Sequence, residues 1–258
     1  MQRPEKKEQV GGTQDESSAD FPMRINRYLA LQGVATRRGA DELVSRGRVF
    51  VNDKRAVLGQ TVDEGDRVEV KKAGRGGRKL RYYAYNKPDG IVTHSPTEQE
   101  DAITDLLPDE MQGQGLFPVG RLDKDSHGLI ILTNDGRVTN RLLAPEYEHE
   151  KEYIVKTKLP IRGNFKQYLE EGVAIEGYLT KPTQVRVLGD NRFSIVLTEG
   201  KKHQIRRMVV ALKNEVIDLK RIRVMNVLLG NLSEGSVRPV EGAELERFLE
   251  MLGLPALP

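Results

Sequence analysis

Two carboxylates in a short charged loop are the side chains in this sequence best placed to do chemistry. Asp123 and Asp125 lie in the run GRLDKDSHG, between the apolar segments 116–119 and 129–132. Loops whose ends are held by a rigid scaffold often carry catalytic groups, and a carboxylate there can act as nucleophile or general base. Two other uses fit the same pattern. The aspartates can cap backbone donors in a turn, or they can bind a metal ion as a pair.

The metal hypothesis gains little from the rest of the chain. No His-x-x-x-His spacing accompanies the two aspartates, and the Glu-x-x-His match from Glu146 to His149 has no second copy. The sequence has no cysteine, which excludes disulfides, thiolate nucleophiles and cysteine-based zinc sites. We therefore discount a bound metal.

A second group of reactive side chains lies at 198–208, where an apolar strand pattern runs through a glycine turn into a helical pattern. Ile205, Met208, Val209 and Leu212 recur at helical spacing and form a buried stripe, which places Arg206 beside the stripe. Residues 201–223 carry 8 basic side chains and 2 acidic ones. Arg206 is therefore expected to reach inward and to pair with a buried carboxylate, for structure or for catalysis.

A third group is a run of arginines near the N-terminus. Residues 24–55 contain 7 arginines and 1 lysine against 3 acidic side chains. Arginine is the residue that forks onto phosphate oxygens, so RNA binding is favoured over an ordinary solvated surface. The candidate RNA-binding residues are Arg24, Arg27, Arg37, Arg38, Arg46 and Arg48.

These groups have to be positioned by at least two structural units, for which 258 residues are sufficient. Residues 1–22 have almost no large apolar side chain and are predicted to be a disordered tail. Two short helical patterns and short strands at 49–51 and 68–70 make residues 23–70 a small α+β module. Residues 71–79 are basic and glycine-rich, as in a flexible linker. Residues 80–258 form the second domain.

The second domain is predicted to be α+β, with a mixed and largely antiparallel sheet. Alternating apolar residues predict strands, and irregularly spaced helices argue against strict βαβ order. The expected strands are 83–85, 152–155, 185–187, 192–197 and 223–227, and the expected helices are 137–143, 164–171, 204–213 and 244–251. No apolar run reaches the roughly 20 residues of a membrane helix, and the first residues lack a secretory signal. We therefore expect a cytoplasmic protein.

Four stretches, taken together, resemble one enzyme family. They are Asn86 to Val92 (NKPDGIV), Gly120 to Asp123 (GRLD), Lys151 to Tyr153 (KEY) and His203 to Met208 (HQIRRM). In this order, behind residues that resemble the αL-type RNA-binding domain of a ribosomal protein, they are similar to the motifs of pseudouridine synthases of the RsuA family. The resemblance extends from residue 23 to about 240. Lys124 to Ser126 and His149 to Val155 are most similar to the RluF type.

This resemblance implies isomerisation of uridine to pseudouridine within RNA, without metal or cofactor. Asp123 would be the essential carboxylate, as nucleophile or as base toward the sugar, and Arg206 would pair with it. Tyr153 would stack on the uracil and take the proton from carbon 5, with Ile205 packed nearby. Arg121 would occupy the place of the flipped base. Lys87, in the first of the motifs, is a further candidate for substrate binding.

The implied substrate is ribosomal RNA, of the large subunit for the RluF type, with transfer RNA as a second candidate. We expect a monomer that contacts no membrane. Two other functions fit the residues: an RNA-binding assembly factor in which Asp123 is only structural, and a metal-dependent nuclease using Asp123 and Asp125. A methyltransferase is disfavoured because no Gly-x-Gly loop joins a strand to a helix.

Overall fold

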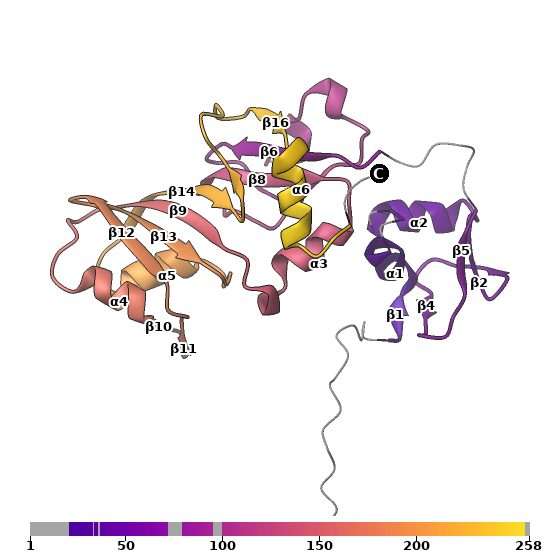
Figure 1. The fold of residues 1–258 in the computed structure, drawn as a ribbon, viewed down its shortest axis with the longest axis horizontal. Helices are drawn as coiled ribbons and strands as arrows, with labels where there is room; N and C mark the ends of the chain where they lie inside the picture. Colours follow the sequence, from indigo (N-terminus) through magenta and orange to yellow (C-terminus); the bar gives the residue numbers. More distant parts are fainter. Residues whose placement is uncertain (1–20, 33, 36, 72–78, 95–99, 256–258) are drawn as a thin grey trace, which may run out of the picture.

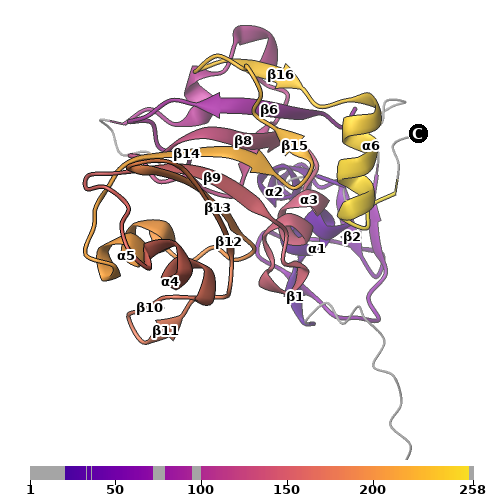
Figure 2. The same cartoon turned by 60° about the vertical axis from the view of Figure 1, so that its left-hand side comes forward.

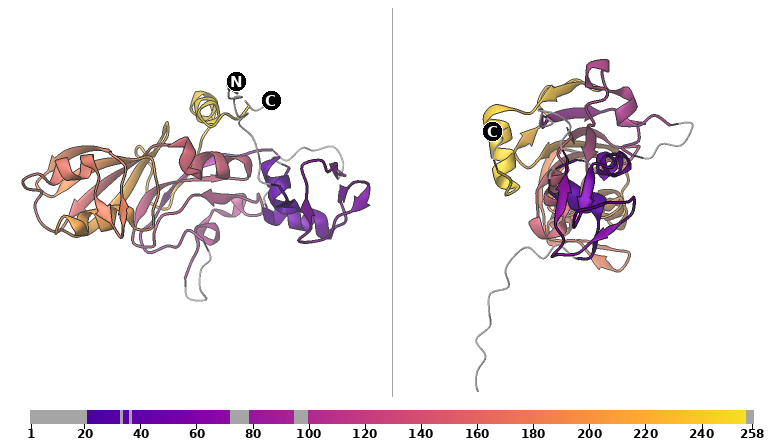
Figure 3. Two further views of the ribbon diagram at one scale, coloured as in Figure 1. Left: turned by 90° about the horizontal axis from the view of Figure 1, so that it is seen from below. Right: turned by 90° about the vertical axis from the view of Figure 1, so that its right-hand side faces the viewer.

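The computed structural model describes residues 21–32, 34, 35, 37–71, 79–94 and 100–255. The expected tail at 1–22 and the expected linker at 71–79 lie almost entirely outside these ranges, so both stay predictions. The described residues form a small N-terminal module at one end of the long axis and a larger body built on a single wide sheet (Figures 1 and 3).

The N-terminal module packs two helices against short strands around its own apolar core. Its elements are β1 (Met23–Arg24), α1 (Ile25–Leu31), α2 (Arg37–Ser45), β2 (Val49–Val51), β3 (Lys54–Arg55), β4 (Thr61–Val62) and β5 (Val68–Val70). β3, β2 and β5 form one antiparallel sheet, and β1 pairs with β4. Ile25 and Leu29 of α1 and Ala40 and Val44 of α2 are buried together with Val49. The helical spacing of these residues turns one face of each helix inward.

The larger body contains a nine-stranded sheet. Seven strands follow the order β12-β13-β9-β14-β8-β6-β16, and of the other two, β15 pairs with β14 and β7 pairs with β8. Its strands are β6 (Tyr82–Lys87), β7 (Phe117–Val119), β8 (His127–Thr133), β9 (Lys151–Thr157), β12 (Gln184–Gly189), β13 (Arg192–Leu197), β14 (Val216–Val224), β15 (Val227–Leu228) and β16 (Val237–Pro239). Every pair in this sheet is antiparallel except β14 with β8. The predicted mixed, largely antiparallel sheet is therefore confirmed.

Helices and a hairpin cover the sheet (Figure 2). They are η1 (Ile103–Leu106), η2 (Asp109–Met111), α3 (Arg137–Leu143), η3 (Pro145–Tyr147), α4 (Phe165–Glu171), the hairpin of β10 (Ala174–Ile175) and β11 (Tyr178–Leu179), α5 (Gln204–Ala211) and α6 (Gly242–Met251). Alternate residues of β8 enter different cores, as the period of a strand requires. Ile131 packs with α3 and α6, and Ile130 packs with η1 and η2. A third core joins α4 and α5 to β9, β12 and β13.

The parallel pair of β8 and β14 brings together residues far apart in the sequence. Gly128 pairs with Arg221, and its φ is +100°. A Cβ atom added to Gly128 would lie 2.3 Å from the carbonyl oxygen of Arg221, so only glycine fits this close approach of the two backbones. The first residues of β8, which follow the Asp123 loop directly, are thus fixed against the second half of the chain.

The N-terminal module contacts the larger body where α3 begins. A Cβ atom added to Gly136 would lie 3.0 Å from the carbonyl oxygen of Ala30 in α1 and 3.3 Å from that of Ala35. α3 starts at the next residue, and β8 ends three residues before Gly136. The module is therefore seated on the sheet body through the turn between β8 and α3.

One predicted strand is wrong. Residues 223–227 are not continuous, because β14 ends at Val224 and β15 begins at Val227, and the two strands pair as a tight hairpin. Met225 in the turn has a φ of +53°. The apolar alternation across 223–227 resembles a strand because both arms of the hairpin contribute to it. The long strand is instead β14. Its polar residues Asp218 and Lys220 interrupt the alternation of apolar and polar residues by which a strand is recognised in a sequence.

Candidate active site

The Asp123 loop connects β7 to β8, which pair with each other, so the sheet holds both of its ends. A turn closes the loop, since the Ser126 N–H donates to the Asp123 carbonyl oxygen at 3.1 Å. Thr93 fixes the position before Asp123. Its hydroxyl donates to the Leu122 carbonyl oxygen at 2.7 Å and accepts from the Leu122 N–H at 3.1 Å. The Asp123 carboxylate is still 37% exposed, so a rigid backbone presents an accessible side chain.

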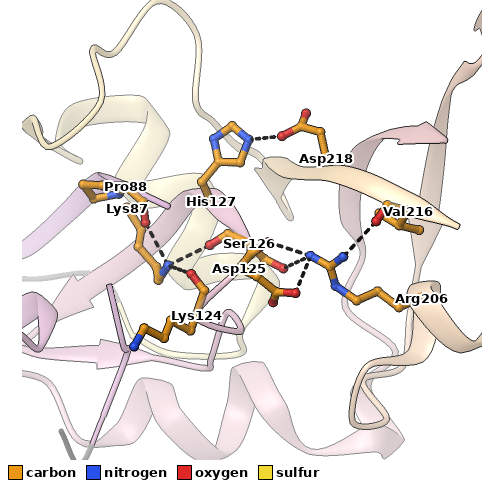
Figure 4. A network of polar contacts seen from close by, with 9 residues as sticks. All are labelled: Lys87, Pro88, Lys124, Asp125, Ser126, His127, Arg206, Val216 and Asp218. Carbon is orange, nitrogen blue, oxygen red and sulfur yellow. Dashed lines mark hydrogen bonds and ion pairs between the residues drawn. The ribbon is translucent and has the colours of Figure 1, made fainter. Parts of the chain in front are cut away.

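Lys87 lies completely buried beneath the far half of the loop (Figure 4). Its Nζ donates to the carbonyl oxygens of Ser126 at 2.7 Å, Pro88 at 2.8 Å and Lys124 at 3.4 Å. Burial lowers the pKa of Lys87 to about 8, against the opposing effect of Asp89, Asp125 and Asp123. Lys87 was expected to bind substrate, but its contacts are with backbone, and it braces the loop from below.

The buried ammonium of Lys87 predicts a pH-dependent stability. The pKa of a lysine side chain in an unfolded chain is about 10.4. Between about pH 8 and this value, the unfolded chain therefore binds more protons than the folded one. The free energy of unfolding should therefore rise with pH in this window, by up to about 3 kcal/mol. In Lys87→Met the rise should be missing. Burial also lowers the pKa of Lys151 to about 8, but Lys151 is present in both proteins and cancels.

Denaturant unfolding of wild type and Lys87→Met at about pH 7.5 and about pH 10 measures this difference. The unfolding free energy of wild type minus that of Lys87→Met should increase by up to about 3 kcal/mol from the lower to the higher pH. A gap that stays constant would show that Lys87 keeps an ordinary pKa in the folded protein.

Arg221 of β14 fixes the part of the loop around Arg121, although it is not among the site residues predicted from the sequence. Its side chain is buried, its Nε donates to the Leu129 carbonyl oxygen at 2.6 Å, and one terminal nitrogen donates to the Arg121 carbonyl oxygen at 3.3 Å. Arg221 also lies directly opposite Tyr153 in the pairing of β14 with β9. It thus joins the loop to the strand that carries Tyr153. One weak signal was available, since Leu219 and Val224 on either side of it are apolar and buried.

Arg206 does not form the predicted pair with Asp123. Its guanidinium instead donates to the Asp125 carbonyl oxygen at 2.6 Å, contacts the Asp125 carboxylate at 3.1 Å, and reaches the Ser126 hydroxyl and the Val216 carbonyl oxygen (Figure 4). The start of α5 directs this side chain to the far side of the loop. Asp123 lies instead beside His203, with 3.7 Å between Nε2 and Oδ1. His203 has a φ of +53° just before α5.

The other predicted site residues are placed as follows. Tyr153 is half-buried on β9 and packs against the apolar cluster that contains Ile205 and Met208 of α5. Ile205 itself is buried, whereas Arg121 at the start of the loop is exposed. Cross-strand pairing with Arg221, which holds the Arg121 carbonyl oxygen, links Tyr153 to the loop. The predicted residues from three separate motifs therefore gather around one end of the sheet.

Four of the six predicted RNA-binding arginines face outward. Arg24, Arg27, Arg37 and Arg46 are exposed, and Arg48 is half-buried. Arg46 forms an ion pair with Glu42 at 2.5 Å. Arg38 lies in α2, and its side chain is outside the described part of the structure. The two helices and the loop after them thus present a positively charged surface.

The described residues contain neither a metal-binding cluster nor a membrane-spanning helix. In these ranges no group of three or more His, Asp or Glu side chains is arranged to hold a metal ion. None of the described helices has the length and apolar character needed to cross a membrane.

Comparison with known proteins identifies both parts of the chain. Residues 81–211 match the model of the RNA pseudouridylate synthase family, and residues 23–68 match the S4 domain. The dual-specificity RNA pseudouridine synthase RluF of Escherichia coli (strain K12) is 39% identical over 236 residues, which cover 90% of this chain and 80% of the relative. Ribosomal large subunit pseudouridine synthase B of Bacillus subtilis (strain 168) is 33% identical over 87% of this chain and 95% of its own length. A crystal structure of a pseudouridylate synthase superposes with a TM-score of 0.65 at 28% identity, covering 89% of this chain and 99% of that one.

Proposed function

Since the chain belongs to the RNA pseudouridine synthases of the RsuA family, we propose that it isomerises one specific uridine of large-subunit ribosomal RNA to pseudouridine. The observation that carries this proposal is the Asp123 loop, whose backbone is held by Lys87, Arg206 and Arg221 while its carboxylate stays accessible. Catalysis requires such preorganised groups, whereas a structural aspartate in an assembly factor does not. RluF and synthase B, named for RNA and large-subunit substrates, support the choice of RNA.

The reaction breaks the bond between N1 of uracil and C1′ of the ribose, rotates the base and joins its carbon 5 to C1′. Carbon 5 then loses a proton and N1 gains one, so the change is an isomerisation that consumes no other reactant. Asp123 acts on the sugar, either by attacking C1′ as a nucleophile or by removing a ribose proton as a base. Both roles require a carboxylate at a fixed position, which the braced loop supplies.

The surrounding residues divide the remaining work. Tyr153 stacks on the uracil and takes the proton from carbon 5, with Ile205 packed behind it. Flipping the uridine out of its stack costs a few kcal/mol, and stacking on one aromatic ring returns about 1 to 3 kcal/mol. Arg121 occupies the position that the flipped uridine leaves in the RNA. Arg206 acts through Asp125 and the loop backbone, which keep Asp123 in place.

The test is to map pseudouridines in large-subunit ribosomal RNA from a strain that lacks the gene, and to restore the missing one with purified protein. Restoration should proceed in the presence of a metal chelator, which would inactivate a metal-dependent nuclease. An assembly factor would bind the RNA and restore nothing. Transfer RNA belongs in the same assay, because RluF is named for a dual specificity.

We propose that the enzyme works in the cytoplasm as a monomer.

The N-terminal module should supply much of the RNA affinity. Deleting residues 1–70 removes the exposed arginines, whereas the three apolar clusters of the sheet body contain no residue of the module and should persist. For each phosphate that the shortened protein no longer binds, the magnitude of the log-affinity against log-salt slope should fall by roughly 0.7 to 0.9. Filter binding to large-subunit ribosomal RNA at several salt concentrations measures the slope. An unchanged affinity and slope would mean that the arginines of the module are only a solvated surface.

A further inference from the structure

A basic groove lies beside the Asp123 loop, between α5 and the β10–β11 hairpin. Its cavity volume is about 540 Å³, with Lys202, His203, Arg206, Arg207 and Val210 on the helix side and the hairpin on the other. His203, Arg206 and Arg207 belong to the fourth motif, whereas Lys202, Val210 and the hairpin lie outside all four motifs.

The groove forms beside α5 because only one face of this helix is buried in the apolar core. His203, Arg206, Arg207 and Val210 recur at intervals of three and four residues, so they share one face of the helix and its entry. The other face, with Ile205, Met208 and Val209, is buried in the core. The groove-lining face therefore lies outside the apolar core, and Val210 on it and Lys202 at its entry are exposed.

The charge of the groove remains positive after its internal pairs are counted. Arg207 is matched by Glu176 of the hairpin at 2.9 Å, and Arg206 is matched by Asp125 at 3.1 Å. Lys202 is exposed and forms no ion pair within the described part of the chain. A groove with an unmatched cation attracts an anion such as a phosphate group.

Apolar side chains also line the groove. Val210 is 60% exposed although it lies among arginines, and Ile175 and Ala211 line the groove next to it. Positive side chains beside an exposed apolar side chain match a nucleotide, which offers a phosphate and the flat face of a base. The groove also leads directly to the reacting group, because His203 at its end lies 3.7 Å from Asp123.

We propose that this groove binds the single-stranded RNA immediately flanking the target uridine, with a phosphate near Lys202 and a base against Val210. The proposal rests on the proposed function, since it assigns the neighbouring nucleotides to a defined place once the uridine is at Asp123. It makes the groove a determinant of which uridine is chosen. The nucleotide on this side must be unpaired to enter.

Tethered cleavage tests the location directly. Because the chain has no cysteine, Leu179→Cys, at an exposed position of the β10–β11 hairpin outside the groove lining, provides a single attachment point for an iron chelate that generates hydroxyl radicals. Bound to unmodified large-subunit ribosomal RNA, this protein should cut the nucleotides next to the uridine that the wild type converts. Leu188→Cys, on the exposed face of the edge strand β12, is the matched control and should cut elsewhere or not at all. Equal cutting from both positions, or cuts remote from the modified uridine, would overturn the proposal.

Affinity variants test the chemistry. Lys202→Gln should lower the magnitude of the salt slope by about 0.7, the value for one single-strand phosphate contact, and reduce kcat/KM about 3- to 10-fold. Lys213→Gln, an exposed lysine just beyond α5 and outside the groove, should change neither. Val210→Asp should reduce kcat/KM at least about tenfold, whereas Val210→Lys should keep or increase RNA affinity. Wild-type behaviour in Lys202→Gln and Val210→Asp would refute the groove while leaving the proposed function intact. Failure of the wild type itself to form pseudouridine would refute the proposed function instead.

Discussion

Replacing Asp123 by asparagine should abolish pseudouridine formation while leaving the fold and the RNA affinity nearly unchanged. The amide keeps the shape of the side chain but has neither the charge nor the nucleophilic oxygen that either proposed role needs. The backbone contacts that hold the loop involve Thr93, Lys87 and Arg221 and do not use the Asp123 carboxylate. We expect a loss on the order of 10⁴-fold or more in the single-turnover rate, measured by tritium release from carbon 5.

Asp125→Asn is the matched control, two residues along the same loop. Its carboxylate is 62% exposed, and Arg206 also holds the backbone carbonyl of Asp125, which the substitution retains. An exposed ion pair contributes little, so turnover should stay within about tenfold of wild type. Equal and complete loss in both variants would revive a paired-carboxylate metal site. Turnover above background in Asp123→Asn would remove Asp123 from the chemistry.

Tyr153→Phe should slow turnover by about 10²- to 10⁴-fold with little change in RNA affinity. The substitution keeps the ring that stacks on uracil and the packing against Ile205, and deletes only the hydroxyl proposed to take the carbon 5 proton. Because bond cleavage precedes this proton transfer, the variant should also show a larger isotope effect with deuterium at carbon 5.

The control for this experiment is Tyr168→Phe, an exposed tyrosine on α4 that should behave as wild type. Binding to large-subunit ribosomal RNA should be the same in all three proteins. If Tyr153→Phe turns over as fast as wild type, Tyr153 serves only in stacking, and another group removes the proton.

The sequence predicted the elements whose period is simple. α3 spans Arg137–Leu143 and β13 spans Arg192–Leu197, as predicted, since α3 has one buried face, β13 is a short and largely apolar run, and both have clear boundaries. The position of the Asp123 loop between two paired strands could also be predicted, because both flanking segments are strongly apolar. Local patterns of this kind depend on residues close in the chain.

The partners of the site depend on distant residues and could not be predicted in the same way. Arg206 meets Asp125 rather than Asp123 only once α5 is placed against the loop, after His203 with its φ of +53°. Arg221 could not be recognised because a buried arginine in a strand looks like a solvent-facing one until its carbonyl acceptors are known. Lys87 was predicted to contact substrate for the same reason.

The close approach of Gly128 to Arg221 also sets the order of events when the protein is made. These two residues are 93 positions apart in the chain, and Arg221 also supplies the donors that fix Leu129 and Arg121. At about 5 to 20 residues per second, roughly 5 to 20 s separate their synthesis on the ribosome. The N-terminal module, complete by residue 70, has no such long-range requirement and can fold early. A nascent chain therefore acquires its RNA-binding surface well before its catalytic loop is braced, and it stays inactive on the RNA that surrounds it until β14 has been made.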